Sequence, residues 1–404
     1  MTPVVSAPVE HEARQVGPYP DPIVQVGSST TPVCGVRDYA GVLERAFRSG
    51  GTDVSTFWCD VDPSAGVPAS VRQARRWLSR VRREIEKTQP RVIILHYSVF
   101  AYGPRGVPVL APLVARELAA TGVPVLGLLH EFAYPFGRRG WRGTVQALSH
   151  RAALPTVVRH CDALAVTSER RASWLATRRW LPRRPVVFIP VFSNLPPVEP
   201  EVMPEKDSPS IGVFGFGGPA VDVELVASAV AILRARGRRV RLVLIGAPGP
   251  NGAAARRWWQ ALEDRDSLSA LRFTGVQAPR ELARELAGVD VLVFADRSGP
   301  DSRRTTLAAG LALGRAVVAV DGPERWGRAV SERAIIVASP GSQAFAAELE
   351  RLLDDRSLRE SQGARAAEFY GRFMAPEIAV ARLLEVMSVW ERPTHSSALA
   401  GKAA

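Results

Sequence analysis

The sequence predicts an α/β protein made of two Rossmann-like domains with an interdomain cleft. Short apolar runs alternate with helical patterns along most of the 404 residues, and such alternation is typical of parallel sheets covered by helices on both faces. A hydrophobic content of 46% is enough for two large cores. Residues 195–210 carry five prolines and no apolar period, which indicates a linker between two similar halves.

The first series of elements lies before this linker. Its expected strands are apolar runs at residues 23–26, 54–58, 92–95, 125–129, 163–166 and 186–189. The expected helices lie near residues 36–49, 70–87, 109–121, 143–160 and 169–179. We assign residues 21–195 to this first domain and expect residues 1–20, which are polar and contain proline, to be disordered.

The second series follows a linker over residues 196–208. Its expected strands are residues 211–214, 241–245, 271–274, 291–294, 316–320 and 334–337. We assign residues 209–374 to the second domain, residues 375–390 to a closing helix that returns to the first domain, and residues 391–404 to a disordered tail.

Residues 291–320 contain the clearest candidate site. A buried strand is followed by a loop with Arg303 and Arg304, and a small-residue helix begins at Thr305 and Thr306, which we expect to cap it. Unpaired backbone N–H groups, the helix dipole and two arginine side chains then point toward one place, which suits a phosphate or diphosphate. The alternative is a structural cap beside two solvated arginines.

Glycines mark two further loops. Gly215, Gly217 and Gly218 follow an expected strand, where glycine lets the backbone approach a ligand closely, although a tight turn is an equal alternative. Their spacing does not match G-x-G-x-x-G, so nicotinamide binding is not indicated. Gly35 opens a helix that offers a second anion-type start, and the neighbouring Cys34 is expected to be a small packed side chain.

Polar residues follow two strands of the first domain. His130 and Glu131 end an apolar strand, where binding residues of α/β folds concentrate, and an imidazole there is able to hydrogen-bond a sugar hydroxyl. Tyr102 and Arg105 lie in an aromatic, glycine-rich loop after another strand, which suits binding of a sugar or a lipid. An ordinary polar strand end and an ordinary surface loop are the alternatives.

The formal charge is +12, which favours acidic partners. Residues 138–184 hold eleven arginines against one Asp and one Glu, and Trp141 and Leu148 share a helical face there. Peripheral contact of this segment with an anionic membrane is one interpretation, and packing of the helix on its own sheet is the other. No stacking platform accompanies the arginines, so we expect no nucleic-acid partner.

Other sequence features narrow the class of protein. Three widely separated cysteines show neither metal-ligand spacing nor a disulfide framework. The first fifteen residues lack a basic region followed by an apolar core, and we expect no signal peptide. We therefore expect a cytoplasmic protein, with peripheral contact at the inner membrane face left open.

Five segments together resemble the retaining GT-B glycosyltransferases of family 4, also called group 1. They are CGVRDYAGVLERAF (34–47), LLHEFAYPF (128–136), IGVFGFGG (211–218), LRFTGVQAPRELARELAGVDVLVFAD (271–296) and SRRTTLAAGLALGRAVVAV (302–320). The resemblance covers roughly residues 22–390. It implies transfer of a sugar, with retained configuration, from a nucleotide-diphosphate sugar in the second domain to a small-molecule, glycan or lipid-linked acceptor in the first. It also implies that the reaction requires no metal and no cofactor.

The resemblance also assigns residues to roles. His130, Arg303 and Arg304 are implied to be catalytic. Donor-binding residues are implied at Gly215, Gly217, Gly218, Gly275, Val276, Asp301, Ser302, Arg303, Arg304, Thr305 and Thr306. Residues of the acceptor side or the cleft are implied at Gly35, Arg37, Asp38, Tyr102, Arg105 and Glu131.

The sequence departs from the family pattern at two places. Where the family often has two Glu eight positions apart, this chain has Asp301 and Ala309, and the Lys that often follows the second glycine loop is missing. We interpret the Arg303–Arg304 pair as the replacement for that charge. Two alternatives stay open: a nucleotide-sugar epimerase, and a catalytically weak GT-B protein that acts as a binding partner or scaffold.

Overall fold

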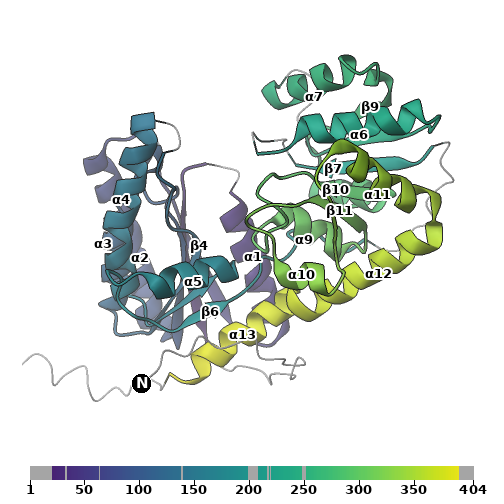
Figure 1. The fold of residues 1–404 in the computed structure, drawn as a ribbon. Coiled ribbons are helices and arrows are strands. Elements are labelled where there is room, and N and C mark those ends of the chain that lie inside the picture. Colours follow the sequence, from purple (N-terminus) through teal and green to yellow (C-terminus); the bar gives the residue numbers. More distant parts are fainter. Residues whose placement is uncertain are drawn as a thin grey trace, which may run out of the picture. The chain divides into compact units, whose positions relative to one another are not determined.

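The computed structural model describes residues 21–31, 34–62, 64–137, 140–198, 208–215, 218, 220–247 and 252–390. The chain divides into two compact units, one formed by Met1–Pro190 with Pro376–Ala404 and the other by Val191–Ala375. Each unit contains one six-stranded parallel sheet with helices on it (Figure 1). The predicted α/β class with two Rossmann-like domains is confirmed.

The sheet of the first unit has the strand order β2-β1-β3-β4-β5-β6, with every neighbouring pair parallel. The strands are β1 (Ile23–Ser29), β2 (Val54–Asp60), β3 (Val92–Ser98), β4 (Val125–Glu131), β5 (Ala163–Val166) and β6 (Val186–Phe188). β1 and β3 are buried along their whole length, as expected for strands covered on both faces.

Alternation along these strands divides their side chains between two helical layers. The helices are α1 (Gly35–Ser49), α2 (Val67–Thr88), η1 (Pro104–Gly106), α3 (Ala111–Ala119), α4 (Gly140–Arg159), α5 (Glu169–Thr177) and α13 (Pro376–Ser388). Val24 and Val26 join the core formed with α2, α3 and α4. Gln25 points the other way and donates to the Ala40 carbonyl of α1, which packs on α13.

The sheet of the second unit has the strand order β12-β11-β10-β7-β8-β9, again parallel throughout. The strands are β7 (Ser210–Phe214), β8 (Arg241–Ile245), β9 (Leu271–Phe273), β10 (Val291–Phe294), β11 (Ala316–Val320) and β12 (Ile336–Ala338). The helices are α6 (Val223–Ala235), α7 (Ala253–Glu263), η2 (Leu268–Ala270), α8 (Pro279–Ala287), α9 (Thr305–Ala312), α10 (Gly327–Ser331), α11 (Ser342–Asp354) and α12 (Arg356–Phe373).

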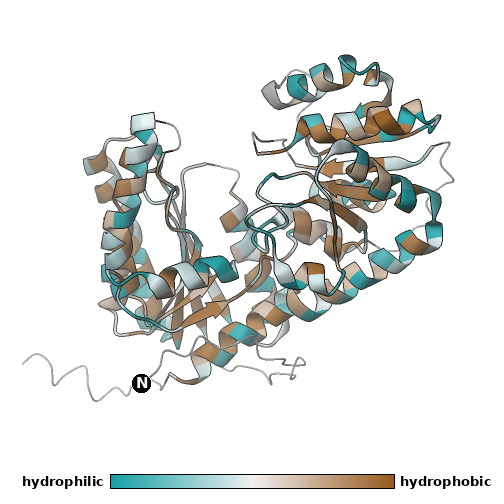
Figure 2. Cartoon of the chain, viewed as in Figure 1, coloured by the Kyte–Doolittle hydropathy of each residue, from teal (hydrophilic) through white to brown (hydrophobic). Residues whose placement is uncertain are grey.

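Hydropathy follows this layering within each unit. The strands are mostly apolar, whereas many helices are polar on one side and apolar on the other (Figure 2). In the second unit, β7 and β10 lie at the centre of the sheet, and their buried aliphatic residues pack against α6 and α11. The central strands are therefore a rigid base for the loops at their carboxyl ends.

The segment after β6 packs with the second unit. The Val191 N–H donates to the Ser302 carbonyl at 2.8 Å, and the Ser193 N–H donates to the Tyr370 hydroxyl at 3.1 Å. The division therefore falls at Pro190, five residues before the predicted end of the first domain. Most of the predicted linker, residues 199–207, and the predicted disordered ends 1–20 and 391–404 lie outside the described residues.

Candidate functional site

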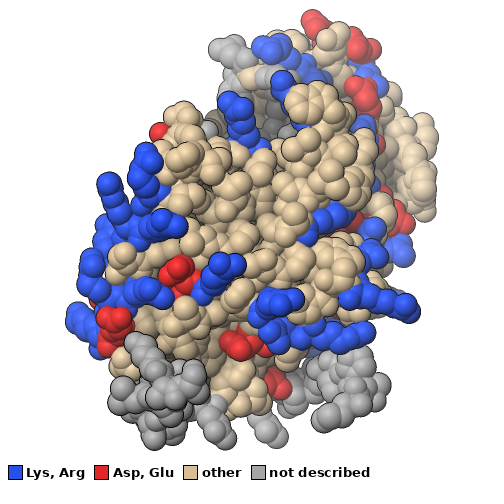
Figure 3. Space-filling model, turned by 90° about the vertical axis from the view of Figure 1, so that its left-hand side faces the viewer, with Lys and Arg blue, Asp and Glu red and all other residues tan. Residues whose placement is uncertain are grey.

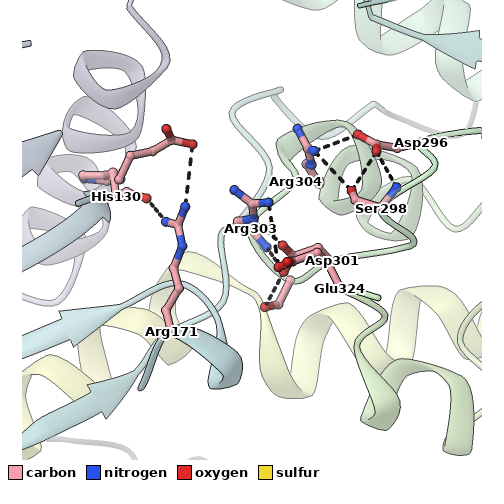
Figure 4. Close-up of polar contacts among 10 residues, drawn as sticks. His130, Arg171, Asp296, Ser298, Asp301, Arg303, Arg304 and Glu324 are labelled. Atoms are coloured by element: carbon pink, nitrogen blue, oxygen red, sulfur yellow. Dashed lines mark hydrogen bonds and ion pairs between the residues drawn. The ribbon is translucent and has the colours of Figure 1, made fainter. Parts of the chain in front are cut away.

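Arg303 and Arg304 lie in the loop between β10 and α9. The Arg303 Nε donates to a carboxylate oxygen of Asp301, and its Nη2 is 3.9 Å from Glu324 Oε2. The Arg304 Nη2 is 2.7 Å from Asp296 Oδ2 (Figure 4). Each guanidinium is thus held by an acidic side chain of its own unit, which limits its rotation before any ligand binds.

The acidic anchors are themselves fixed. The Asp301 side chain is 2% exposed. Asp296 Oδ1 accepts hydrogen bonds from the Ser298 N–H at 2.9 Å and from the Ser298 hydroxyl at 2.7 Å. Among the described residues, the buried Nε of Arg304 has no hydrogen-bond acceptor. An oxygen of a bound phosphate would supply one, and a buried donor without a partner is otherwise costly.

The start of α9 differs from the predicted threonine cap. Thr305 is the first helical residue, the capping position is Arg304 with extended backbone, and no side chain accepts a hydrogen bond there. The capping prediction was wrong because the chain enters the helix one residue earlier. The absence of a side-chain cap favours an anion site, because the first N–H groups of α9 remain available as donors at the positive end of the helix dipole.

The glycine loop after β7 lies beside this helix start. A Cβ atom placed on Gly215, whose φ is +115°, would lie 3.5 Å from Thr306 Cγ2. Gly218 has open space around its Cα, and Gly217 lies outside the described residues. The parallel pairing of β7 with β10 thus brings the predicted glycine loop and the predicted arginine loop to one edge of one sheet.

Gly275 and Val276 follow β9 at the side of the same sheet. Gly275 has a φ of +76° and open space beside it, and Val276 is 74% exposed. The Thr274 hydroxyl, which accepts from the Gly246 N–H at 2.9 Å, ties this loop to the end of β8. Both predicted residues are accessible to a ligand, although they lie on the edge strand and not beside the arginines.

A second loop, which sequence reasoning missed, supports the arginine loop. Cβ atoms on Gly299 and Gly322 would lie within 3.0 Å of the facing backbone, so the two loops touch without side chains between them. The Glu324 N–H donates to the Ser298 carbonyl at 2.7 Å, and the Trp326 N–H donates to the Pro300 carbonyl at 2.8 Å. The Gly322 position after β11 was the available signal, because glycine permits such a close approach.

The two departures from the family pattern are explained in part. Asp301 is buried beneath Arg303 as an anchor. Ser302 is also buried, and its carbonyl accepts the Val191 N–H. Ala309 is 1% exposed within α9. The second acidic position of the pattern is therefore a packed apolar contact in this chain.

In the first unit, His130 ends β4 and lies against α1. Its ring packs edge-on against Tyr39, with ring centroids 5.0 Å apart. Its carbonyl accepts a hydrogen bond from Arg171 Nη1, and Arg171 Nη2 is 3.7 Å from Glu131 Oε1 (Figure 4). Burial, together with His96 and Arg171, holds the pKa of His130 well below its usual value, so the imidazole is neutral.

His96 and Gln25 complete this group, and both were missed from the sequence. His96 Nδ1 is 3.1 Å from His130 Nε2, and His96 Nε2 is 2.8 Å from Gln25 Oε1. Burial lowers the pKa of His96 to about 3. Both residues sit inside apolar strand segments, and a polar residue within such a run was the only signal.

The predicted residues of α1 differ in their exposure and contacts. Gly35 is exposed at the start of the helix, where no side chain forms a cap, so an anion-type start remains accessible. Arg37 is engaged with Asp60 at 2.6 Å and lies over the Trp58 ring. Asp38 is exposed, and partial burial of its carboxyl raises the pKa while Arg37 lowers it.

In the aromatic loop, the prediction for Tyr102 is corrected. Tyr102 is 1% exposed, and its hydroxyl donates to the His96 carbonyl at 2.7 Å. It therefore packs in the core formed with α2, α3 and α4 and does not present its ring to an acceptor. Arg105 is exposed in η1, with a φ of +54°, and its carbonyl accepts from the Gln146 side chain at 2.9 Å.

Two further properties of the described residues concern metal ions and membranes. No group of three or more His, Cys, Asp or Glu side chains in this part of the chain is arranged to hold a metal ion. No helix within the described ranges is both long and apolar enough to cross a membrane. Absence of a metal requirement stays a prediction.

Comparisons with known proteins identify the class of the second unit. Residues 209–355 match the family described as glycosyl transferases group 1. This segment contains β7 to β12 and therefore the whole arginine loop. No protein of curated function matches the chain in sequence.

Solved structures are similar over nearly the whole chain. Sucrose-phosphate synthase from Thermosynechococcus elongatus has a TM-score of 0.65 at 17% identity, over 91% of this chain and 98% of that one. A glycosyltransferase from Rickettsia africae has a TM-score of 0.67 at 10% identity, over 92% and 98%. HepE from Anabaena, in complex with UDP, has a TM-score of 0.63 at 14% identity, over 91% and 100%.

These likenesses confirm the predicted GT-B fold, and the family match confirms the predicted resemblance to group 1 glycosyltransferases. Glycosyl transfer is thus the activity that the matched segment, residues 209–355, supports. The epimerase alternative is not favoured, because neither the matched family nor these structures point to it.

Proposed function

We propose that this chain transfers a sugar from a nucleoside-diphosphate sugar, bound at the start of α9, to an acceptor hydroxyl, with retention of configuration. The observation that carries the proposal is the uncapped start of α9 beside Arg303 and Arg304, each anchored by a carboxylate. The HepE structure, which contains UDP, supports a nucleoside diphosphate as the donor group.

The proposed reaction places negative charge on the departing diphosphate. The bond between the anomeric carbon and the β-phosphate oxygen breaks, a bond from that carbon to the acceptor oxygen forms, and the hydroxyl proton passes to the departing diphosphate. Oriented guanidinium groups and helix N–H donors stabilise this charge as it develops. In this proposal the two arginines supply the positive charge, and no metal ion is required.

Remaining residues take supporting roles. Gly215 and Gly218 leave room for the diphosphate beside Thr306, and the loop of Gly275 and Val276 is open to the nucleoside. The acceptor binds the first unit near His130. His130 is neutral, so it hydrogen-bonds a hydroxyl group and carries no charge that would attract the diphosphate.

Calorimetric titration with UDP, GDP and ADP tests the donor site. Arg304→Ala should weaken binding by about 1.5–3 kcal/mol, the scale of a hydrogen bond to a charged group. Arg351→Ala is the matched control, because Arg351 also pairs with an acidic side chain of this unit, Glu348, at 2.8 Å. Binding that is equal in the Arg304 and Arg351 variants contradicts the assignment.

Product analysis separates the proposal from its alternatives. Incubation with the nucleotide sugar that binds should release a nucleoside diphosphate only when an acceptor is present, whereas an epimerase would return an isomeric nucleotide sugar. Failure of the wild-type chain to bind any of the three diphosphates would favour a binding or scaffold protein.

For the acceptor, we propose a lipid-linked molecule reached at an anionic membrane surface, to which the protein binds from the cytoplasmic side. The observation that favours it is a row of exposed apolar side chains on α4: Trp141 is 73% exposed, Val145 48% and Leu148 56%. A helix that only packs on its own sheet would bury its apolar positions, so this row indicates a partner.

Basic and aromatic side chains extend the same surface. Arg151 lies 4.1 Å from the Phe136 ring centroid, and Arg178 lies 4.8 Å from that of Trp174. Lys and Arg clearly outnumber Asp and Glu on this side of the first unit (Figure 3). Arg138 and Arg139, part of the predicted basic segment, lie outside the described residues. Exposed aromatic residues beside arginines suit an anionic lipid interface.

Co-sedimentation with vesicles tests this surface. Binding should require phosphatidylglycerol in phosphatidylcholine vesicles, fall with added salt, and weaken in Trp141→Ser. Trp259→Ser is the matched control, because Trp259 is 42% exposed on α7 of the other unit. Equal sedimentation of the two variants, or none by the wild-type chain, would point to a soluble acceptor.

A further inference from the structure

We propose that Gln25 and His96 are positioning residues that fix the tautomer of His130, so that its Nδ1 offers a lone pair to a hydroxyl group of the substrate. This inference rests on the proposed function for the role of His130 toward a sugar or acceptor.

A continuous chain of side chains crosses the first sheet, one from each of four adjacent strands. Thr56 lies on β2, Gln25 on β1, His96 on β3 and His130 on β4, which is the spatial order of these strands. The Gln25 Nε2 is 3.3 Å from Thr56 Oγ1, Gln25 Oε1 is 2.8 Å from His96 Nε2, and His96 Nδ1 is 3.1 Å from His130 Nε2.

The far end of this chain sets its direction. The Thr56 hydroxyl donates to Glu44 Oε2 at 2.7 Å, and Glu44 is paired with Arg48 at 2.7 Å. A carboxylate only accepts hydrogen bonds, so the Thr56 proton is committed to Glu44 and its oxygen accepts from Gln25. Glu44 at the outer end therefore determines that Gln25 donates to Thr56 and that Thr56 donates to Glu44.

The orientation of the Gln25 amide follows. Its Nε2 faces the Ala40 carbonyl at 3.3 Å as well as Thr56 Oγ1, and both are acceptors. A flipped amide would place Oε1 against two acceptors in a site where Gln25 is completely buried. The amide oxygen therefore faces His96, and His96 must carry its proton on Nε2.

The tautomer of His96 in turn determines which nitrogen of His130 carries the proton. A neutral His96 with its proton on Nε2 has a lone pair on Nδ1, which accepts from the Nε2–H of His130. Burial, with His96 on β3 and Arg171 on α5, holds the pKa of His130 low. Among the described residues, Tyr39 on α1 packs against the His130 ring, and Glu131 follows His130 on β4. The proton of neutral His130 is then on Nε2, and Nδ1 carries the lone pair.

This tautomer selects the chemistry that His130 is able to recognise. A lone pair on Nδ1 accepts a hydrogen bond from a hydroxyl group, whereas a phosphate or carboxylate oxygen would face it without a proton between them. The relay therefore assigns His130 to a neutral sugar or acceptor hydroxyl. It also predicts that loss of Gln25 or His96 alters His130 without any direct contact to substrate.

Nitrogen NMR of the full chain, labelled with 15N-histidine, tests the relay without any ligand. His130 and His96 should each show a protonated Nε2 and an unprotonated Nδ1. Two other histidines are internal references. His160, whose Nδ1 is 2.8 Å from the Thr156 carbonyl, should carry its proton on Nδ1. His150, whose Nδ1 accepts the Tyr134 N–H, should carry its proton on Nε2. Loss of one signal set in His130→Gln assigns that residue.

A variant of Gln25 then tests its positioning role. Gln25→Leu should convert His130 into a mixture of tautomers, while the His160 signals should stay unchanged. A protonated Nδ1 on His130 in the wild-type chain, or an unaltered His130 in Gln25→Leu, overturns the inference. The wild-type spectrum decides even where a variant fails to fold, and nucleoside diphosphate titration tests the donor site separately.

Discussion

Removal of Arg303 separates the structural role of its ion pair from the proposed role in donor binding. The Asp301 side chain is 2% exposed, and the Arg303 side chain is 22% exposed. In Arg303→Ala the carboxylate would keep, among the described residues, two longer hydrogen bonds, from the backbone N–H of residue 303 at 3.3 Å and from the Ser302 hydroxyl at 3.4 Å. The variant therefore leaves a buried charge with poor compensation.

The cost follows from that burial. Loss of one partner of a buried ion pair costs about 3–5 kcal/mol, and because the vacated space opens to water we expect about 3 kcal/mol here. For a unit of this size, that corresponds to a decrease in melting temperature of roughly 6–12 °C. The double variant Arg303→Ala/Asp301→Asn removes the uncompensated charge and should recover most of the loss.

Calorimetry of the full chain measures both effects. Scanning calorimetry should show the lower melting temperature in Arg303→Ala and its recovery in the double variant. Titration with the nucleoside diphosphate that binds the wild-type chain should show weaker binding in both variants, because both lack the guanidinium. A single variant as stable as wild type would refute the buried ion pair, and a double variant that binds as wild type would refute the phosphate role.

Three further predictions follow from the structure. In the folded protein His96 is neutral, with a pKa of about 3, whereas in the unfolded chain it takes up a proton below about pH 6.5. Lowering the pH from 7 to 5 should therefore reduce the free energy of unfolding by about 2 kcal/mol. In denaturant titrations, His96→Gln should lack this part of the acid sensitivity. Gly322→Ala places a Cβ 2.3 Å from the Ser298 carbonyl carbon, so it should weaken nucleoside diphosphate binding and lower the melting temperature, whereas Gly327→Ala, which meets nothing within 4 Å, should do neither. His130→Ala should lower kcat in a transfer assay while calorimetric nucleotide affinity stays unchanged, and equal turnover would return His130 to a structural role.

Local patterns in the sequence were sufficient for the architecture. Short β-branched runs alternate with amphipathic segments, and a strand buried on both faces must be apolar at nearly every position, so the strands at residues 163–166, 241–245, 291–294 and 316–320 were located residue for residue. The arginine loop was found for the same reason. It follows a central strand and precedes a helix, and both neighbours are recognisable from local composition.

The partners of the predicted residues were not contained in local patterns. Asp296 and Glu324 reach the arginines only because β10 and β11 are neighbours in the sheet and their loops meet through Gly299 and Gly322. Likewise, the apolar context of Tyr102 did not distinguish a packed ring from an exposed one, and the structure buries it.

The histidine relay shows the same division most clearly. His130 was visible in the sequence because it ends a strand, where polar residues are common in α/β sites. Gln25 and His96 were not, because each is a single polar residue within an apolar run and gains meaning only from its lateral neighbours. Sequence determines which residues form a strand and which face each occupies, whereas strand order, set by packing of the whole sheet, decides which polar groups meet across it.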